Sequence, residues 1–436
     1  MPSLGAVVML SLVAVLVIVW PLPHVIALRN TLLVSLLVWL VAERWSRKNW
    51  KFVESAFFWP SLCLAALVIW LFIVAFWVDS EPARSLAGLK GEWLPPLVAF
   101  AVGALLVSAL SRKGVSQQLV LRTVFGALML LIVLQLALGI WYLLVEGGIP
   151  DFFGGITDHK ANITYVSAIA LSMLLADATV RTSEAGILGL PRWLQFASFA
   201  AVIVTTYMSG TRNGIIIVLL LTAIWAPIFL INVLRLSGRA TLAGLLVLAL
   251  CIAVATWAMF KIDKRWSRLI VTVPVAFNFE RDHRWLDVQK RGYPLAADGK
   301  PVEATAYERI SWALVAMKLI AEHPFGTSIT KDAFRQIVEV QYGPTRTGHA
   351  HNGYLDLGLE AGVPGLFLWL VFLIMLLRLG VVNLRGPTYA SLALILYIVG
   401  FGTRSALDAI LRDHIMEQFM FFAALFLAVS DARKLS

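Results

Sequence analysis

The sequence predicts an all-α polytopic membrane protein with about twelve transmembrane helices and one large, partly helical loop. Three observations lead to this fold class. Apolar residues make up 60 % of the 436 residues, against ~45–50 % in soluble domains, and the mean hydropathy is +0.82. Many windows of ~20 residues hold almost no charge, and each is long enough to cross ~30 Å of hydrocarbon as a helix. Their apolar runs are continuous rather than alternating, which disfavours a transmembrane β-barrel.

The apolar windows divide the chain into three parts. We expect nine transmembrane helices in residues 1–260, a large loop with the catalytic motif over residues 261–362, and three transmembrane helices with a cytoplasmic C-terminus in residues 363–436. The predicted spans are 4–20, 24–42, 56–78, 93–110, 122–145, 162–177, 193–209, 213–234, 240–260, 363–380, 388–403 and 414–430. Four prolines fall within spans, where neighbouring helices can satisfy the backbone around a kink: Pro60, Pro95, Pro96 and Pro227.

Cysteine usage and charge narrow the class of protein further. Cys63 and Cys251 both fall in predicted spans, so we expect packed core residues rather than a disulfide framework. The first residues lack the basic region of a cleaved signal, and the first span is therefore expected to be retained. The net charge of +10 is better explained by membrane lipids or an anionic lipid-linked substrate than by nucleic acid.

Basic residues in the short loops predict the orientation. With a cytoplasmic N-terminus, the inner loops are rich in lysine and arginine, the span count is even, and both termini lie inside. The loop over residues 261–362 then lies outside, because loops longer than ~60 residues cross largely regardless of charge. The inner basic residues are Arg44, Arg47, Lys48, Lys51, Arg112, Lys113, Arg122, Arg181, Arg192, Arg235, Arg239, Arg378, Arg385, Arg433 and Lys434.

Three arginines of the short outer connections deserve a functional hypothesis. Arg212 sits in the tight turn Ser-Gly-Thr-Arg-Asn-Gly between two spans, and Arg404 and Arg412 are on the same side. Interfacial snorkelling is common for an arginine at a helix end. Three on one face, beside the long loop, favour an anion-binding site instead.

The outer loop contains helical patterns. Residues 307–322 have helical periodicity and stop at His323-Pro324-Phe325-Gly326, residues 331–340 are a shorter amphipathic candidate, and residues 351–360 form a third, closed by Gly362. Residues 282–303 are polar and irregular, which is compatible with a mobile lid.

The histidine-rich stretch His349-Ala350-His351-Asn352-Gly353 is the candidate catalytic motif. His351 lies at or just before the third helix, whose positive end disfavours a protonated imidazole. A neutral imidazole can accept a proton from a hydroxyl. Asn352 is expected to fix the ring or cap the helix, and Arg309 and Arg212 suit a phosphate-rich leaving group because the planar guanidinium binds phosphate bidentately.

Alternative readings accompany the other histidines. His349 and His351 have the spacing of a metal pair, but no acidic or cysteine partner follows at a ligand spacing, so we expect no metal. His323 is expected to be structural. His159 and Lys160, on an outer loop, are candidates for substrate contact or simply solvated. No nucleotide-binding motif is present, so ATP-driven transport has no support in the sequence. We also expect no cofactor.

The pattern His351-Asn352, nine residues, then Gly362-x-x-Gly365 resembles the signature of bacterial O-antigen ligases, which share a superfamily with O-antigen polymerases and protein O-oligosaccharyltransferases. Arg212, in Ser-Gly-Thr-Arg, and Arg309, in Glu-Arg-Ile-Ser-Trp, resemble two arginines of that family. The layout of about twelve spans, cytoplasmic termini and one large periplasmic loop is similar too. Leu366 departs from the family, because many ligases have threonine after the second glycine.

The resemblance implies a bacterial inner-membrane glycosyltransferase without metal or nucleotide. It would move a glycan from undecaprenyl diphosphate to a sugar hydroxyl of lipid A-core oligosaccharide at the periplasmic face. His351 would be the general base, Arg212 and Arg309 would bind the diphosphate, and Asn352, His349, Arg404, Arg412, Lys160 and His159 are the further candidates for substrate binding.

Three alternatives remain open. An O-antigen polymerase would extend the lipid-linked glycan, and a protein O-oligosaccharyltransferase would place it on protein. A lipid or polysaccharide transporter, from another class, predicts inverted repeats and ionisable residues near mid-membrane. Most spans here are uncharged at their centres, with Arg29 as an exception.

Overall fold

The computed structural model describes residues 3–45, 56–150, 153–157, 159–180, 186–232, 264–384 and 389–431, with scattered positions between 242 and 261. Within these ranges the chain is helical, and its one β-feature is an isolated antiparallel bridge between Leu295 and Pro301. The all-α prediction is therefore confirmed. Cys251, the expected span over residues 240–260 and several inner basic residues, such as Arg47 and Arg235, lie largely or wholly outside the described residues.

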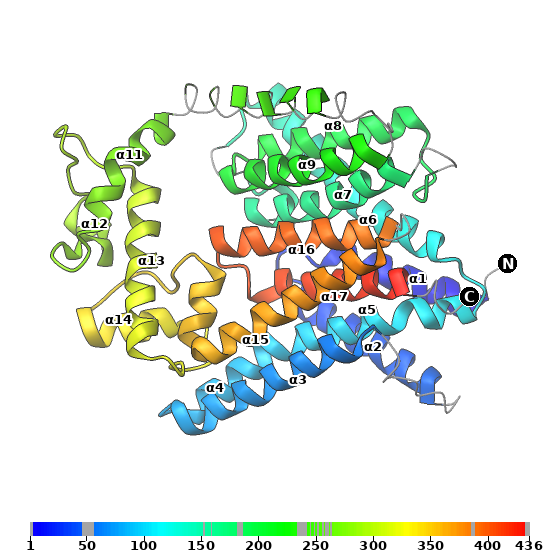
Figure 1. The fold of residues 1–436 in the computed structure, drawn as a ribbon, viewed down its shortest axis with the longest axis horizontal. Coiled ribbons are helices and arrows are strands. Elements are labelled where there is room, and N and C mark those ends of the chain that lie inside the picture. The colour runs from blue at the N-terminus through cyan, green and yellow to red at the C-terminus, as the bar shows by residue number, and fades with distance from the viewer. Residues whose placement is uncertain are drawn as a thin grey trace.

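Long helices pack side by side in a bundle (Figure 1). They are α1 (Leu4–Val19), α2 (Ile26–Trp45), α3 (Phe58–Ile73), α5 (Leu94–Arg112), α6 (Gln117–Val145), α7 (Lys160–Val180), α8 (Arg192–Met208), α9 (Arg212–Asn232), α15 (Gly353–Asn383), α16 (Tyr389–Leu407) and α17 (Asp413–Asp431). Nine helical segments of the described chain are long and apolar enough to cross a membrane, and α1 is a shorter apolar helix. The chain is therefore a multi-pass membrane protein, whereas the count of twelve spans is not confirmed.

The bundle has buried helices at its centre and more exposed apolar helices around them. In α7 and α17, 89 % of the most apolar window is buried, against 28 % in α2. A central charged pair crosses this core, because Arg29 Nε lies 2.9 Å from Glu417 Oε2, which also accepts a hydrogen bond from Trp20 Nε1 at 2.8 Å. The unusual arginine within the second span is thus compensated by a carboxylate.

Exposed aromatic side chains gather at both ends of the bundle. Trp77 and Tyr207 are exposed near the end of the bundle that carries the loop segment, and Trp59 and Trp193 near the opposite end. Tryptophan and tyrosine prefer the headgroup level of a bilayer, where an apolar ring and a polar tip are both accommodated. This distribution supports a membrane lying across the helices between the two groups.

The prolines of the predicted spans lie in helices, as expected. Pro60 is in the first turn of α3, where a proline is well tolerated because the first N–H groups of a helix have no intrahelical acceptor. Pro95 and Pro96 lie at the start of α5, directly after the π-helical turn η2 (Leu89–Trp93), within the continuous helical segment Pro82–Arg112. Pro227 lies inside α9.

The loop segment forms a compact unit at one end of the bundle, opposite the end where α1 begins and α17 finishes (Figure 1). Its elements are α11 (Lys264–Ala276), η4 (His283–Leu286), α12 (Val288–Arg291), α13 (Ala304–Glu322) and α14 (Ala333–Tyr342). The helices predicted over 307–322 and 331–340 correspond to α13 and α14, whereas α11 was not predicted. The unit has its own hydrophobic core, which includes Trp285, Tyr307, Trp312, Phe334 and Leu359.

A helical hairpin from the bundle supports this unit. Between α3 and α5 the chain forms the π-helical turn η1 (Val74–Val78), the short helix α4 (Pro82–Gly88) and a second π-helical turn η2 (Leu89–Trp93). Ser85 Oγ accepts a hydrogen bond from Ile329 N at 2.8 Å, and Gly88 lies so close to the Ile329 carbonyl that a side chain would not fit. The hairpin therefore holds the loop unit against the bundle.

Candidate active site

The motif His351-Asn352-Gly353 begins α15. Asn352 is the N-cap of the helix, and its side-chain oxygen accepts hydrogen bonds from the backbone N–H groups of Tyr354 (3.1 Å) and Leu355 (3.2 Å). Its amide donates to the carbonyl of Ala406 at 2.9 Å, at the end of α16. Asn352 therefore caps the helix and fixes it to α16 at once.

Two glycines further along α15, Gly362 and Gly365, are required by close packing. Gly362 has φ +68° and breaks α15 into two helical parts, so the helix end predicted there is present as a kink. The Pro324-Phe325-Gly326 turn packs directly on it, and Val363 N donates to Pro324 O at 2.8 Å. Gly365 lets the Trp70 indole approach, whose Nε1 donates to Ala361 O at 2.6 Å. The spacing of the motif thus shapes the helix that carries His351.

The imidazole of His351 is half-buried between aromatic groups. Its ring stacks on Trp312 of α13, with centroids 5.1 Å apart and 18° between planes, and the His349 ring lies 4.0 Å away. His351 has φ +54°, a left-handed conformation that is uncommon outside glycine and recurs at functional sites. Its Nδ1 is buried and accepts no hydrogen bond from the described residues.

Both imidazoles are held neutral. Burial and then the positive charge of Arg309 lower the pKa of His351 to about 4, with Asp408 opposing and Arg412 adding to the shift. Burial, followed by the charges of His351 and Arg412, lowers the pKa of His349 to about 3. The expected neutral state is present, but its main physical cause is burial, rather than the helix end that we had invoked.

The last residues of α16 join the segments that carry the predicted catalytic groups. The carbonyl of Leu407 accepts hydrogen bonds from Arg309 Nη1 at 2.9 Å and from Asn213 Nδ2 at 3.1 Å. Asn213 follows Arg212 at the start of α9, in the tight turn predicted from sequence. The next carbonyl, of Asp408, accepts from Gly353 N at 3.1 Å. The starts of α9 and α15 and the first half of α13 therefore meet at one helix end.

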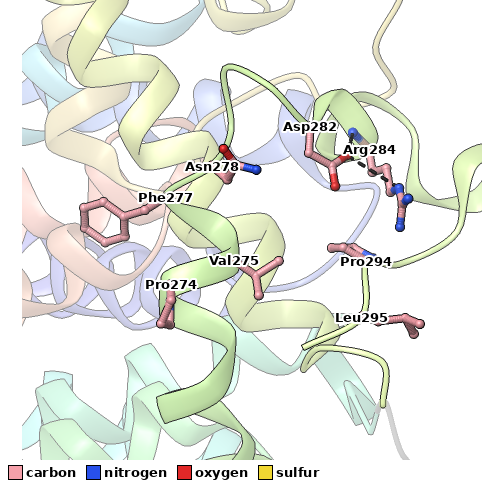
Figure 2. Close-up of a pocket in the computed structure, with 8 residues that line it drawn as sticks. All are labelled: Pro274, Val275, Phe277, Asn278, Asp282, Arg284, Pro294 and Leu295. Carbon is pink, nitrogen blue, oxygen red and sulfur yellow. Dashed lines mark hydrogen bonds and ion pairs between the residues drawn. The ribbon is translucent and has the colours of Figure 1, made fainter. Parts of the chain in front are cut away.

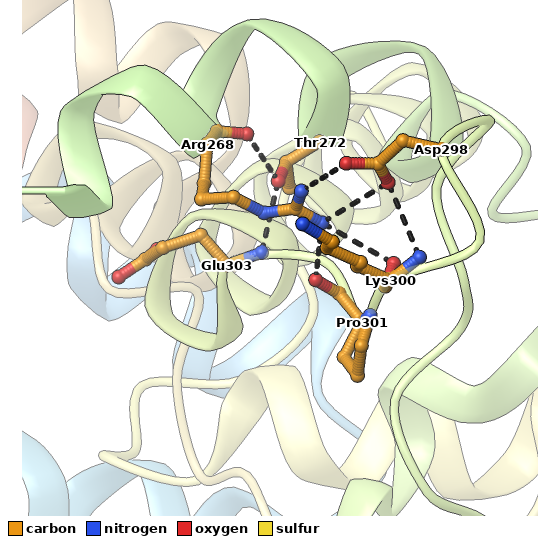
Figure 3. A network of polar contacts seen from close by, with 6 residues as sticks. All are labelled: Arg268, Thr272, Asp298, Lys300, Pro301 and Glu303. Atoms are coloured by element: carbon orange, nitrogen blue, oxygen red, sulfur yellow. Dashed lines mark hydrogen bonds and ion pairs between the residues drawn. The ribbon is translucent and has the colours of Figure 1, made fainter.

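Arg212 is fixed by Glu303, a residue that sequence reasoning missed. Arg212 Nη2 lies 2.8 Å from Glu303 Oε1, and Glu303 is the N-cap of α13. Figure 3 shows how α11 holds this region: Thr272 Oγ1 accepts from Glu303 N at 2.9 Å, and Arg268 binds Asp298 and the carbonyl oxygens of Lys300 and Pro301. The loop unit and the start of α9 are thus linked through one ion pair.

The two remaining arginines behave differently from the expectation of an open anion site. Arg404 is 1 % exposed, and its Nη2 donates to Ala161 O at 2.9 Å, so it is a core residue and not a surface cation. Arg412 Nη2 lies 3.2 Å from Asp356 Oδ2 in α15. Sequence position placed both arginines near the end of α16 but did not show which group each side chain contacts.

The other candidates lie at the start of α7. His159 Nδ1 accepts a hydrogen bond from Ala161 N at 3.2 Å, and Lys160 is the first residue of the helix.

His323 is the C-cap residue of α13, consistent with a structural role. No group of three or more histidine, cysteine, aspartate or glutamate side chains in the described ranges is arranged to hold a metal ion.

Two further residues of this region had a detectable sequence signal. Trp312 follows Arg309 by three positions, so both lie on neighbouring parts of one helical surface. Asp408 stands between Arg404 and Arg412 in the outer connection, where an acidic residue beside cations was available as a clue. Glu303 was missed because the helix was expected to begin at residue 307 rather than at Ala304.

Comparison with known families supplies the decisive observation, since residues 197–370 match the model of a family described as O-Antigen ligase. The matched segment, which is less than half of the chain, is similar to proteins of the O-antigen ligase/polymerase superfamily. The matched segment runs from α8 into α15 and includes Arg212, Glu303, Arg309, Trp312 and His351. Its match supports glycosyltransferase activity of the ligase or polymerase type on lipid-linked glycans. No curated protein matches the chain.

Proposed function

We propose that the protein is an O-antigen ligase, which transfers a glycan from undecaprenyl diphosphate to a sugar hydroxyl of lipid A-core oligosaccharide. It acts without a metal or nucleotide. The membrane is the bacterial inner membrane, the loop unit faces the periplasm, and both termini are cytoplasmic. The position of the loop unit opposite the start of α1 and the end of α17 supports this topology (Figure 1).

The chemistry is a single displacement at the anomeric carbon. A ring nitrogen of His351 takes the proton of the acceptor hydroxyl while the acceptor oxygen forms a bond to that carbon. The bond between the anomeric carbon and the diphosphate oxygen breaks, and its electron pair leaves with the undecaprenyl diphosphate. One displacement inverts the anomeric configuration. The imidazolium then releases its proton to water.

One observation carries the proposal: Arg309 and Asn213 donate to the same Leu407 carbonyl, beside the helix start that bears His351. This arrangement supports a shared cavity for a base and two guanidinium groups. Arg212 also lies at the N-terminus of α9, and backbone N–H groups at such an end favour anions. The diphosphate would therefore meet both arginine forks and a helix end.

The charge of Arg309 gives the site a means of activating its base on substrate binding. In the free protein this charge contributes to the low pKa of His351, about 4, at which the imidazole is a weak base. A diphosphate bound to Arg309 compensates that charge, so the pKa of His351 rises toward the operating pH. General bases work best when their pKa lies near that pH.

The proposed organisation keeps three parts. Residues 1–260 and 363–436 form the membrane scaffold, and residues 261–362 carry the catalytic groups apart from Arg212. Substrate contacts from His349, Asn352, Arg412, His159 and Lys160 belong to the proposal. Arg404 is omitted from it because of its burial.

Reconstitution tests the proposal. Purified protein is mixed with undecaprenyl-diphosphate glycan and lipid A-core acceptor in liposomes that contain a chelator and no nucleotide. We expect glycan to appear on the core with inverted anomeric configuration, measured by gel and NMR. Elongation of the lipid-linked glycan alone would make the protein a polymerase, and modification of an added periplasmic protein would make it a protein O-oligosaccharyltransferase. Movement of glycan lipid across the bilayer without any transfer would identify a transporter.

A further inference from the structure

The loop unit contains a cavity that is separate from the residues around His351. It is an open trough of about 770 Å³ between the end of α11 and the stretch around η4 (Figure 2). Its lining residues are Pro274, Val275, Phe277, Asn278, Asp282, Arg284, Pro294 and Leu295. The volume is within the range of ligand-binding sites, ~300–1,000 Å³.

The trough combines apolar faces with polar groups that can still form hydrogen bonds to a ligand. Phe277 and Leu295 leave 61 % and 59 % of their surfaces exposed. Asp282 accepts a hydrogen bond from Arg284 N at 3.1 Å and pairs with Arg284 Nε at 3.5 Å, which leaves the two terminal guanidinium nitrogens available. The side-chain amide of Asn278 makes no hydrogen bond to the described part of the chain, and it also lines the trough (Figure 2).

The walls of the trough are held by bonds behind them. Leu295 pairs with Pro301 across an isolated bridge, and Arg268 of α11 binds the Pro301 carbonyl at 2.5 Å (Figure 3). On the other wall, Trp285 Nε1 donates to Phe279 O at 2.9 Å. A trough with fixed walls loses less conformational entropy when it binds a ligand than a flexible loop does.

The trough is connected to the proposed base through two tryptophans. Trp285, which follows Arg284, accepts a hydrogen bond at its carbonyl from Trp312 Nε1 at 3.1 Å. Trp312 stacks on the imidazole of His351. Trp285 and Trp312 thus link the lining residue Arg284 to the imidazole of His351.

We propose that this trough is a saccharide-binding subsite, which holds sugar units of a glycan substrate some distance from the reacting carbon. The inference rests on the proposed function for its choice of ligand. A pyranose ring has an apolar C–H face, which fits Phe277, Leu295 and the prolines, and an edge of hydroxyls that both donate and accept hydrogen bonds. Asn278, Asp282 and Arg284 together supply acceptors and donors for that edge.

The open shape favours a chain of sugars over a small molecule. A closed pocket buries most of a small ligand, whereas an open trough lets a polymer enter and leave at both ends. The glycan on its lipid carrier and the core oligosaccharide of the acceptor share this chemistry. The subsite would hold one of them in register while the reacting sugar lies near His351.

Binding measurements on the full-length protein in detergent test the subsite. The two probes are the oligosaccharide released by mild acid from the lipid-linked donor and the core oligosaccharide released by mild acid from lipopolysaccharide. Each is titrated calorimetrically into the wild type, Phe277→Ala and Asn278→Ala. We expect one probe to bind and each substitution to raise its Kd about tenfold, the effect of one lost contact or hydrogen bond. The probe that binds identifies the donor or the acceptor as the source.

A matched control is Val340→Ala, which removes an apolar side chain that is 89 % exposed on α14 and does not line the trough. We expect unchanged Kd in this variant. Failure of both probes to bind the wild type, or equal Kd values in all variants, would overturn the subsite. These results do not depend on transfer, so a protein that transfers glycan with no trough effect refutes only the subsite. A protein that binds the probe through the trough but transfers nothing refutes only the proposed reaction.

Discussion

Arg309 and Arg404 are two arginines near the same end of α16 with opposite environments. Arg309 is half-buried, donates to the Leu407 carbonyl, and forms no ion pair with a described residue. Arg404 is 1 % exposed and donates to the Ala161 carbonyl within the helix core. An arginine that keeps an uncompensated charge near the proposed base is suited to an anionic ligand, whereas one enclosed by protein stabilises the fold.

Arg212 and Arg412 extend the same comparison. Both form ion pairs, with Glu303 at 2.8 Å and Asp356 at 3.2 Å, and their side chains are 22 % and 14 % exposed. Arg212 lies at the start of a helix and its partner caps another. We propose that a bound diphosphate displaces Glu303 from part of this guanidinium. Position at the end of the bundle that carries the loop unit therefore does not by itself identify a ligand-binding arginine, and the partner of each guanidinium must be considered as well.

Removal of the proposed base should have the largest effect. We expect His351→Ala to lower the transfer rate by ~10²–10⁴-fold, the usual contribution of a positioned general base. The initial rate in reconstituted liposomes is the measurement, and membrane insertion and thermal unfolding are the controls. Transfer at the wild-type rate by a correctly inserted variant would exclude this imidazole as the base.

The arginines that we assign to the diphosphate should tolerate lysine poorly. We expect Arg309→Lys and Arg212→Lys each to lower kcat by ~10²–10³-fold, because a point charge does not reproduce two parallel hydrogen bonds to developing charge. The matched control is Arg412→Lys, for which we expect a smaller loss. If Arg412→Lys is impaired as much as Arg309→Lys, the distinction between the two arginines is wrong.

The buried arginine should affect stability rather than chemistry. We expect Arg404→Met to destabilise the protein by about 1–3 kcal/mol, because the buried hydrogen bond from the charged guanidinium to the Ala161 carbonyl is lost. The remaining folded protein should keep its kcat. Thermal unfolding in detergent gives the first quantity and rates normalised to folded protein give the second. A large fall in kcat with unchanged stability would return Arg404 to the substrate site.

The ion pair between Glu303 and Arg212 should have a smaller effect on the reaction. We expect Glu303→Gln to change the KM for the lipid-linked donor by about tenfold or less, with kcat less affected, since it alters how Arg212 is held and not the reacting groups. Separate determination of KM and kcat decides this. A kcat loss as large as that of His351→Ala would make Glu303 itself a reacting group.

The sequence predicted the parts of this structure that depend on local pattern. Apolar length located most of the long helices, the His-Pro-Phe-Gly breaker located the C-terminal end of α13, and Gly362 marked the kink of α15. Features that depend on tertiary contact were not accessible. The direction of Arg404 around its helix and the meeting of Arg309 and Asn213 at Leu407 both require knowledge of neighbouring helices. The amphipathic pattern of α11 is local and was overlooked.

The central claim is that Arg309 and His351 act as one site, and the pH dependence of kcat/KM tests it most directly. Protonation of His351 abolishes its action as a base, so wild-type activity should fall on the acid side near the pKa of about 4. In Arg309→Gln the nearby positive charge is gone while burial, Asp408 and Arg412 remain, so the imidazolium is less disfavoured. We predict that the acid limb moves up by about one pH unit. An acid limb at the same pH in both proteins would contradict the account.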